Sequence, residues 1–183
     1  NRSKASIKDK CRSIGVKNNK EQTYEKQRIS NIKLGGEFTV NEKLFINKID
    51  EVTSYLLGFF WADAYLHILK RKSGHLTYRL ILGINQDDGE YVNKLLLKTG
   101  KWSITKKEPE IGKSMIYFHC ANTILGEFLY NNDYKIKSGA SANKILSNIP
   151  EKLHKYFYIG YFDGDGCVYA DKENNKHSMK ITS

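Results

Sequence analysis

Two segments of the chain repeat the same pattern of apolar and small residues, and this repeat constrains the fold more than any other feature. The first segment reads LLGFFWADA over residues 56–64, and the second reads YIGYFDGDG over residues 158–166. In both, Gly separates two apolar pairs, and a small residue, Asp and another small residue close the segment. The aspartates of the two segments, Asp63 and Asp165, are 102 positions apart. A repeat of this period predicts two copies of one structural unit.

The small residues of each segment have the spacing of a helical contact face. Gly58 and Ala62 stand four positions apart, as do Gly160 and Gly164. Residues at this spacing lie on one face of a helix. Small side chains on such a face allow two helix backbones to approach closely. We therefore expect both segments to be helices that pack through these four residues, each delivering one aspartate to a shared point.

Two carboxylates that meet at the paired ends of two helices repel each other unless a cation lies between them. A hard divalent cation such as Mg²⁺, or Mn²⁺ in its place, accepts carboxylate and phosphate oxygens together. Such a cation can activate water and stabilise the leaving oxygen in phosphodiester hydrolysis. Asp63 and Asp165 are therefore candidate catalytic residues and metal ligands.

The charge balance indicates a polyanionic partner. The 183 residues include 30 Lys and Arg against 20 Asp and Glu, a formal net charge of +10. A strongly basic chain favours nucleic acid as its partner. Residues 1–36 hold ten of the basic residues and three of the acidic ones. We interpret residues 1–41 as a basic arm and linker, which either contacts DNA or is a solvated tail.

The spacing of the cysteines and the length of the apolar runs argue against disulfide-rich, zinc-binding and membrane-spanning proteins. Cys11, Cys120 and Cys167 are scattered, and they form no Cys-x-x-Cys pair. This pattern argues against a disulfide framework and a zinc site, and it favours an intracellular, reducing compartment. The longest apolar run, residues 55–61, is far shorter than the roughly 20 residues that span a bilayer. We expect no membrane span and no secretory signal.

The remaining pattern predicts an α+β unit. Residues 42–149 form the first repeat, with the order helix, strand, strand, helix, strand, strand, helix. This order favours an antiparallel sheet covered on one face by helices. The second repeat starts at residue 150 with a helix and the beginning of a strand. The expected helices cover residues 42–63, 87–99, 122–130 and 153–162, and the expected strands cover 65–70, 76–84, 101–107, 113–120 and 167–170.

These motifs resemble the LAGLIDADG homing endonuclease family, whose name is the consensus of this helix. The resemblance covers residues from about 42 to 183. It implies the αββαββα fold with a saddle-shaped sheet, and two motifs in one chain imply the pseudo-symmetric monomeric type. The implied activity is metal-dependent, site-specific cleavage of double-stranded DNA across the minor groove. Such enzymes are typically encoded in introns or inteins as mobile elements, and no intein splicing block is visible here.

The resemblance also implies roles for further residues. It makes Gln86, at the end of the second strand, and Lys137, in YKIKS, candidate catalytic residues that hold the water shell around the scissile phosphate. The backbone carbonyls of Ala64 and Gly166 are candidate metal ligands beside the two aspartates. The candidate DNA-binding residues follow from strand parity after Asp63 and from the second hairpin: His67, Leu69, Arg71, Thr77, Arg79, Lys106, Tyr117 and His119.

Two departures from the family keep alternatives open. Trp61 and Ala64 replace Asp and Gly of the consensus, although the last Asp of the motif is present. A full second repeat needs about 80 to 90 more residues, and seventeen follow Gly166. A monomer is therefore expected if the chain is complete, and a complementary second half is needed otherwise.

The alternative function is nucleic-acid binding without cleavage, by an intron RNA maturase or a transcription regulator. A basic structural protein, whose repeat serves packing alone, is the third reading.

Overall fold

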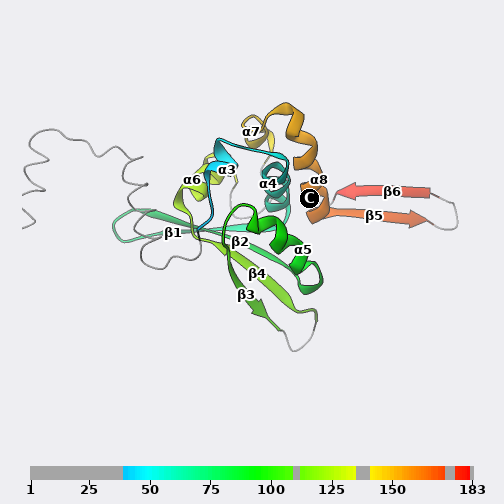
Figure 1. Cartoon of the computed structure of the whole chain (residues 1–183), viewed down its shortest axis with the longest axis horizontal. Coiled ribbons are helices and arrows are strands. Elements are labelled where there is room, and N and C mark those ends of the chain that lie inside the picture. Colours follow the sequence, from blue (N-terminus) through cyan, green and yellow to red (C-terminus); the bar gives the residue numbers. More distant parts are fainter. Residues whose placement is uncertain (1–38, 109–111, 135–140, 172–175, 182–183) are drawn as a thin grey trace, which may run out of the picture. The chain divides into compact units, whose positions relative to one another are not determined.

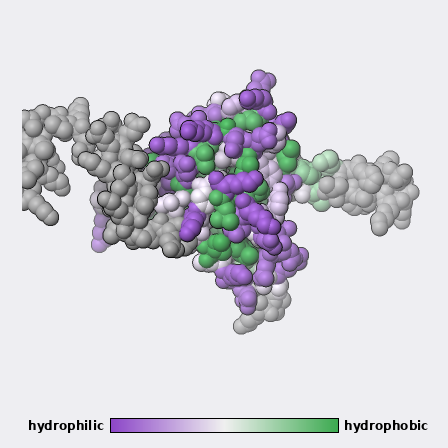
Figure 2. Space-filling model, in the orientation of Figure 1, coloured by the Kyte–Doolittle hydropathy of each residue, from purple (hydrophilic) through white to green (hydrophobic). Residues whose placement is uncertain are grey.

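The structure is a computed structural model that describes residues 39–108, 112–134, 141–171 and 176–181. The basic arm therefore lies outside the described residues except for its last three positions. No helix in the described part of the chain is long and apolar enough to cross a membrane. On the face drawn in Figure 2, hydrophilic side chains surround smaller apolar areas.

The described elements follow the predicted order (Figure 1). The α+β class and the αββαββα order of the first repeat are confirmed, with the expected first helix divided in two. The short helix α7 and the strand β6 were not predicted. The elements are α3 (Lys43–Ile46), α4 (Glu51–Asp63), β1 (Ala64–Lys70), β2 (Leu76–Asn85), α5 (Gln86–Leu97), β3 (Ser103–Lys107), β4 (Met115–Cys120), α6 (Thr123–Asn131), α7 (Asn143–Leu146), a 3₁₀ turn (Glu151–Leu153), α8 (His154–Asp165), β5 (Gly166–Asp171) and β6 (Lys176–Ile181).

The first four strands form one antiparallel sheet in the order β1-β2-β4-β3. Alternate residues of β2 and β4 are buried, among them Leu80, Leu82 and Phe118. Helices pack on this apolar face: a Cβ added to Gly89 of α5 would meet Ile116, and one added to Gly126 of α6 would meet Tyr78. One face of the sheet is therefore core and the other is open, as the alternation predicts.

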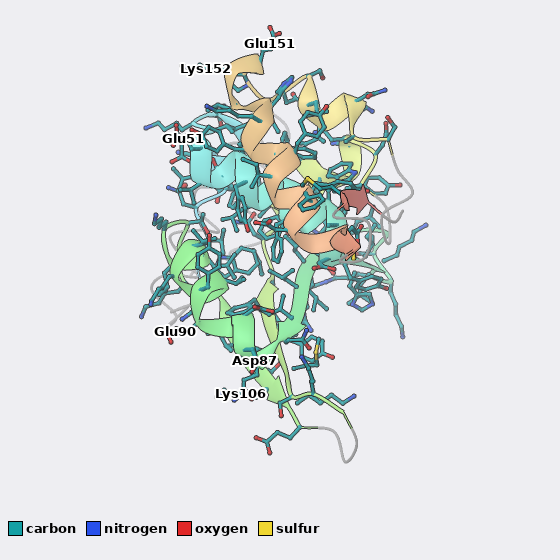
Figure 3. All side chains as sticks on the ribbon, turned by 90° about the vertical axis from the view of Figure 1, so that its right-hand side faces the viewer. Glu51, Asp87, Glu90, Lys106, Glu151 and Lys152 are labelled. Atoms are coloured by element: carbon teal, nitrogen blue, oxygen red, sulfur yellow. The ribbon has the colours of Figure 1, made fainter. Side chains whose placement is uncertain are left out.

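Helix α4 begins at a capping box and is buried almost along its whole length. The Asp50 carboxylate accepts the Thr53 N–H at 2.8 Å, and the Thr53 hydroxyl oxygen accepts the Asp50 N–H at 2.8 Å. Leu56, Leu57 and Phe60 are fully buried in the core. Because α4 is apolar all round, it must be covered on more than one side. The sheet covers one side and α8 another, and α4 and α8 lie side by side in Figure 3.

Strands β5 and β6 form a separate antiparallel hairpin after α8. Gly166 begins β5 immediately after the second motif helix, as Ala64 begins β1 immediately after the first. The predicted strand over residues 167–170 therefore exists, and the helix-to-strand order of the first repeat recurs.

Candidate active site and open sheet face

The two motif helices meet through their glycines in a pseudo-symmetric contact. A Cβ on Gly58 would clash with the carbonyl oxygen of Phe157, and a Cβ on Gly160 would clash with that of Tyr55. Phe157 and Tyr55 are again 102 positions apart, as are the two glycines. The glycine of each helix therefore meets the equivalent carbonyl of the other helix, as a local two-fold axis requires.

The contact continues to the ends of both helices, where the aspartates lie. A Cβ on Gly164 would run into that of Ala62 and would lie 3.3 Å from a carboxylate oxygen of Asp63. The Asp63 carboxylate thus reaches the residue that precedes Asp165. Both aspartates are half-buried. The structure therefore places all four small residues in the helix contact and brings the Asp63 carboxylate to the residue before Asp165.

Hydrogen bonds across the helix pair fix this arrangement. The Ser54 hydroxyl donates to the carbonyl oxygen of Leu153 at 2.8 Å. The hydroxyl of Tyr55 donates to Asp163 at 2.8 Å, and that of Tyr156 donates to Glu51, at the start of α4 (Figure 3), at 2.6 Å. Burial, and then the bond to Asp163, raise the pKa of Tyr55, so this hydroxyl remains a donor. None of these bonds was predicted, because they join residues about 100 positions apart.

The candidate metal ligands at the helix ends fit a hard divalent cation. They are the carboxylates of Asp63 and Asp165 and the backbone carbonyls of Ala64 and Gly166, so every ligand atom is an oxygen. The Ala64 carbonyl also accepts the Tyr134 hydroxyl. Among the described residues, no group of three or more His, Cys, Asp or Glu could hold a metal. A cation here would therefore complete its coordination with water and phosphate oxygens.

The two other candidate catalytic residues are placed differently. Gln86 is the first residue of α5 and is exposed, and its backbone N–H donates to the carbonyl oxygen of Ser114 at 2.9 Å. Lys137 lies outside the described residues. The catalytic roles of both remain predictions.

Most of the candidate DNA-binding residues share the open face of the sheet. His67 pairs with Arg79, and Leu69 pairs with Thr77, so these four side chains lie on the face opposite the core. Tyr117 and His119 lie on the same face. Arg71 follows β1 in the exposed hairpin turn.

Lys106 requires a correction. It pairs with Ile116, whose side chain is buried, so Lys106 lies on the helix-covered side of the sheet rather than on the open face. The neighbouring Lys107 pairs with Met115 and takes the open-face position. Which β3 side chains face the helices depends on the pairing of β3 with β4. The sequence of this exposed strand shows no clear alternation that would reveal it.

The open face also holds residues that the sequence analysis missed. Tyr65 precedes His67 by two positions, and its ring stacks on that of His67 with centroids 6.1 Å apart. Thr105 pairs with Tyr117. The parity counted from Asp63 could have found Tyr65, whereas Thr105 needed the register of β3 against β4.

His119 is held in its neutral form on this face. Partial burial, and then the charge of Arg79, lower its pKa from the ordinary value of 6.5. The Thr105 hydroxyl lies 2.8 Å from its Nε2.

This lowered pKa predicts a weak acid sensitivity of the fold. Between the folded-state pKa of His119 and 6.5, the unfolded chain binds more protons than the folded chain, so stability falls as the pH falls through this window. We expect His119→Gln to lose less stability than the wild type between about pH 7.5 and about pH 5 in urea unfolding. His67→Gln, on the same face, is the control. An unchanged pH dependence in His119→Gln would contradict the assignment.

Comparisons with known proteins find structural neighbours of the chain but no sequence relatives. No protein-family model matches the chain, and no curated protein sequence matches it. Among solved structures, the chain is similar to I-DmoI in complex with DNA and Mn, with 13% identity, 72% of this chain and 89% of that chain covered, and a TM-score of 0.46. It is also similar to the LAGLIDADG meganuclease I-CpaMI bound to uncleaved DNA, with 13% identity, coverages of 69% and 67%, and a TM-score of 0.40.

A third neighbour is the I-LtrWI LAGLIDADG homing endonuclease bound to target DNA, with 13% identity, coverages of 72% and 65%, and a TM-score of 0.41. Against two other I-DmoI structures, the chain spans 62% and 59% of the neighbour's length. These neighbours are LAGLIDADG homing endonucleases, the family that the two helical motifs resemble.

Proposed function

We propose that this chain is a site-specific endonuclease, or part of one, that hydrolyses double-stranded DNA with divalent metal ions held by Asp63 and Asp165. One observation carries the proposal: the glycine contact of α4 and α8 brings the carboxylate of Asp63 up to Gly164, beside Asp165. Two acids at the ends of two packed helices are unfavourable for packing alone, because like charges repel. The structural neighbours, which include I-DmoI in complex with DNA and Mn and with DNA and Ca, agree with this proposal.

The residues of the site have distinct tasks. When bound, the cation would supply a nucleophilic water and charge stabilisation at the leaving oxygen. Asp63 and Asp165 would hold it from opposite sides of the helix pair, and the hydrogen bonds of Tyr55 and Tyr156 keep the two helices from sliding. Gln86 and Lys137 would orient water around the phosphate. We also propose that the chain is encoded in an intron as part of a mobile element and acts in an intracellular, reducing compartment.

The open face of the sheet would contact the duplex. A two-stranded antiparallel ribbon can enter the major groove and read base edges with alternate side chains. The open face offers cationic and aromatic groups that suit phosphate contact and guanine readout. Its acceptors and donors include His67, Thr77 and Tyr117.

Arg79 is the cation whose loss we expect to weaken DNA binding. Arg79→Ala should lower affinity for the target and reduce the slope of log K against log salt by about 1, because one phosphate or base contact is lost. Fluorescence anisotropy at several salt concentrations measures both. Lys98→Ala, at the end of α5 on the helical side, is the matched control. Equal effects of the two substitutions would contradict binding through the open face.

The outer face of α8 supports a complementary second half. Tyr158 and Ile159 are 54% and 49% exposed, whereas their counterparts 102 positions earlier, Leu56 and Leu57, are fully buried in the core. The corresponding positions of the two motif helices are therefore covered in α4 and exposed in α8. We propose that a second sheet covers this face, supplied by further chain or by a partner.

Nucleic-acid binding without cleavage, with intron RNA or DNA, is the alternative function. The two aspartates favour cleavage over this alternative, since a binding protein has no need of opposed carboxylates. The deciding experiment is cleavage of a randomised duplex library by the chain with Mg²⁺, with Mn²⁺ and with chelator. Cuts at defined sites that require the metal would support the proposal. Salt-sensitive binding of duplex or RNA with no cutting, even with a second repeat supplied, would overturn it.

A further inference from the structure

Tyr134 closes the end of the first motif helix from a distant part of the chain. Its hydroxyl oxygen lies 2.8 Å from the carbonyl oxygen of Phe60, and it also donates to the carbonyl of Ala64. The Phe60 carbonyl accepts the Ala64 N–H as well, which is the last backbone bond of α4. The carbonyls at the end of a helix lack further intrahelical donors. The hydroxyl therefore joins the two residues that flank the turn containing Asp63.

Tyr134 is rigidly held in this position. Its side chain is buried, and its ring meets that of Trp61 edge to face with centroids 4.9 Å apart. Burial, and then the negative charge of Asp63, raise the pKa of Tyr134. The hydroxyl therefore stays protonated and remains a donor at neutral pH.

We propose that Tyr134 is a positioning residue for Asp63. Its hydroxyl holds the turn from α4 into β1, and this turn determines the positions from which the Asp63 carboxylate and the Ala64 carbonyl would bind a divalent cation. This inference rests on the proposed function. Both acceptors belong to the first motif segment, residues 56–64, so the effect is confined to the Asp63 side of the helix pair. A partner that orients a metal ligand typically changes metal affinity when it is lost.

The test removes one oxygen atom. Tyr134→Phe keeps the ring and its contact with Trp61 but deletes the hydroxyl. We expect calorimetric titration of the full chain with Mn²⁺, without DNA, to show about tenfold weaker binding than the wild type. Amide hydrogen exchange should accelerate at residues 63–65 and stay unchanged in α8. Tyr130→Phe makes the same chemical change at an exposed tyrosine and serves as the matched control.

Cleavage gives a second readout. Under the proposed function, the pseudo-two-fold relation of Asp63 and Asp165 would assign one aspartate to each strand of the duplex. Tyr134→Phe should therefore slow the cut of one strand more than the other and accumulate nicked product. A loss of general stability would slow both cuts together.

The outcomes separate this inference from the proposed function. If the wild type binds no Mn²⁺ and cuts no DNA, the proposed function is overturned and this inference with it. If the wild type binds Mn²⁺ and Asp63→Asn weakens the binding, but Tyr134→Phe matches the wild type, the positioning role alone is overturned. A Tyr134→Phe chain that fails to fold, or that loses affinity no more than Tyr130→Phe, also overturns it.

Discussion

Replacing either motif aspartate by asparagine should abolish DNA cleavage while leaving DNA binding intact. Asn keeps the size of the side chain but removes the charge that holds a divalent cation, so the water is no longer activated. We expect the cleavage rate of Asp63→Asn and of Asp165→Asn to fall on the order of 10³-fold or more. Cleavage of a selected target, followed on gels, and anisotropy binding to the same target measure the two properties separately.

Asp163→Asn provides the matched control for this prediction. Asp163 is an exposed acid on the same helix, two residues before Asp165, and it accepts the Tyr55 hydroxyl. Asn can accept the same bond through its amide oxygen. Asp163→Asn should therefore cut nearly as well as the wild type. Full activity in Asp63→Asn, or equal losses in all three variants, would remove the two-aspartate mechanism.

Adding a single methyl group at the helix contact should strongly destabilise the fold. A Cβ at Gly58 or Gly160 would run into a backbone carbonyl of the other helix, and backbone cannot rotate away as a side chain can. We expect Gly58→Ala and Gly160→Ala each to lower the free energy of unfolding by about 3 kcal/mol, the upper part of the range for overpacking. Cleavage should fall with it, because the two aspartates are pushed apart.

This expectation opposes the intrinsic preference of helices. In an exposed helix, Gly→Ala stabilises by about 1 kcal/mol, so a net loss would report the clash directly. Gly83→Ala is the control, since its added Cβ would meet the ring of Tyr117 on the open face, which can turn aside. Urea unfolding of the three variants measures the difference. Gly58→Ala and Gly160→Ala as stable as the wild type would contradict the close helix contact.

Much of the fold could be predicted because local patterns determine it. Tyr78, Leu80 and Leu82 alternate with other residues along β2, a pattern that predicts one shared face, and all three are buried. The lengths and order of the elements in the first repeat follow from apolar periodicity and turn residues. Helix α7 was missed, because four residues carry too little periodic pattern to be distinguished from a loop.

The site divides in the same way. Two matched helices that end in aspartates, with small residues along one face of each, can be predicted from the sequence, because this information is local and repeated. The carbonyls that the glycines meet, the open-face position of Lys107 in place of Lys106, and the closure of the turn at Asp63 by Tyr134 emerge only when the chain is folded. Register and long-range hydrogen bonds depend on how distant segments pack, and a single sequence leaves those pairings open.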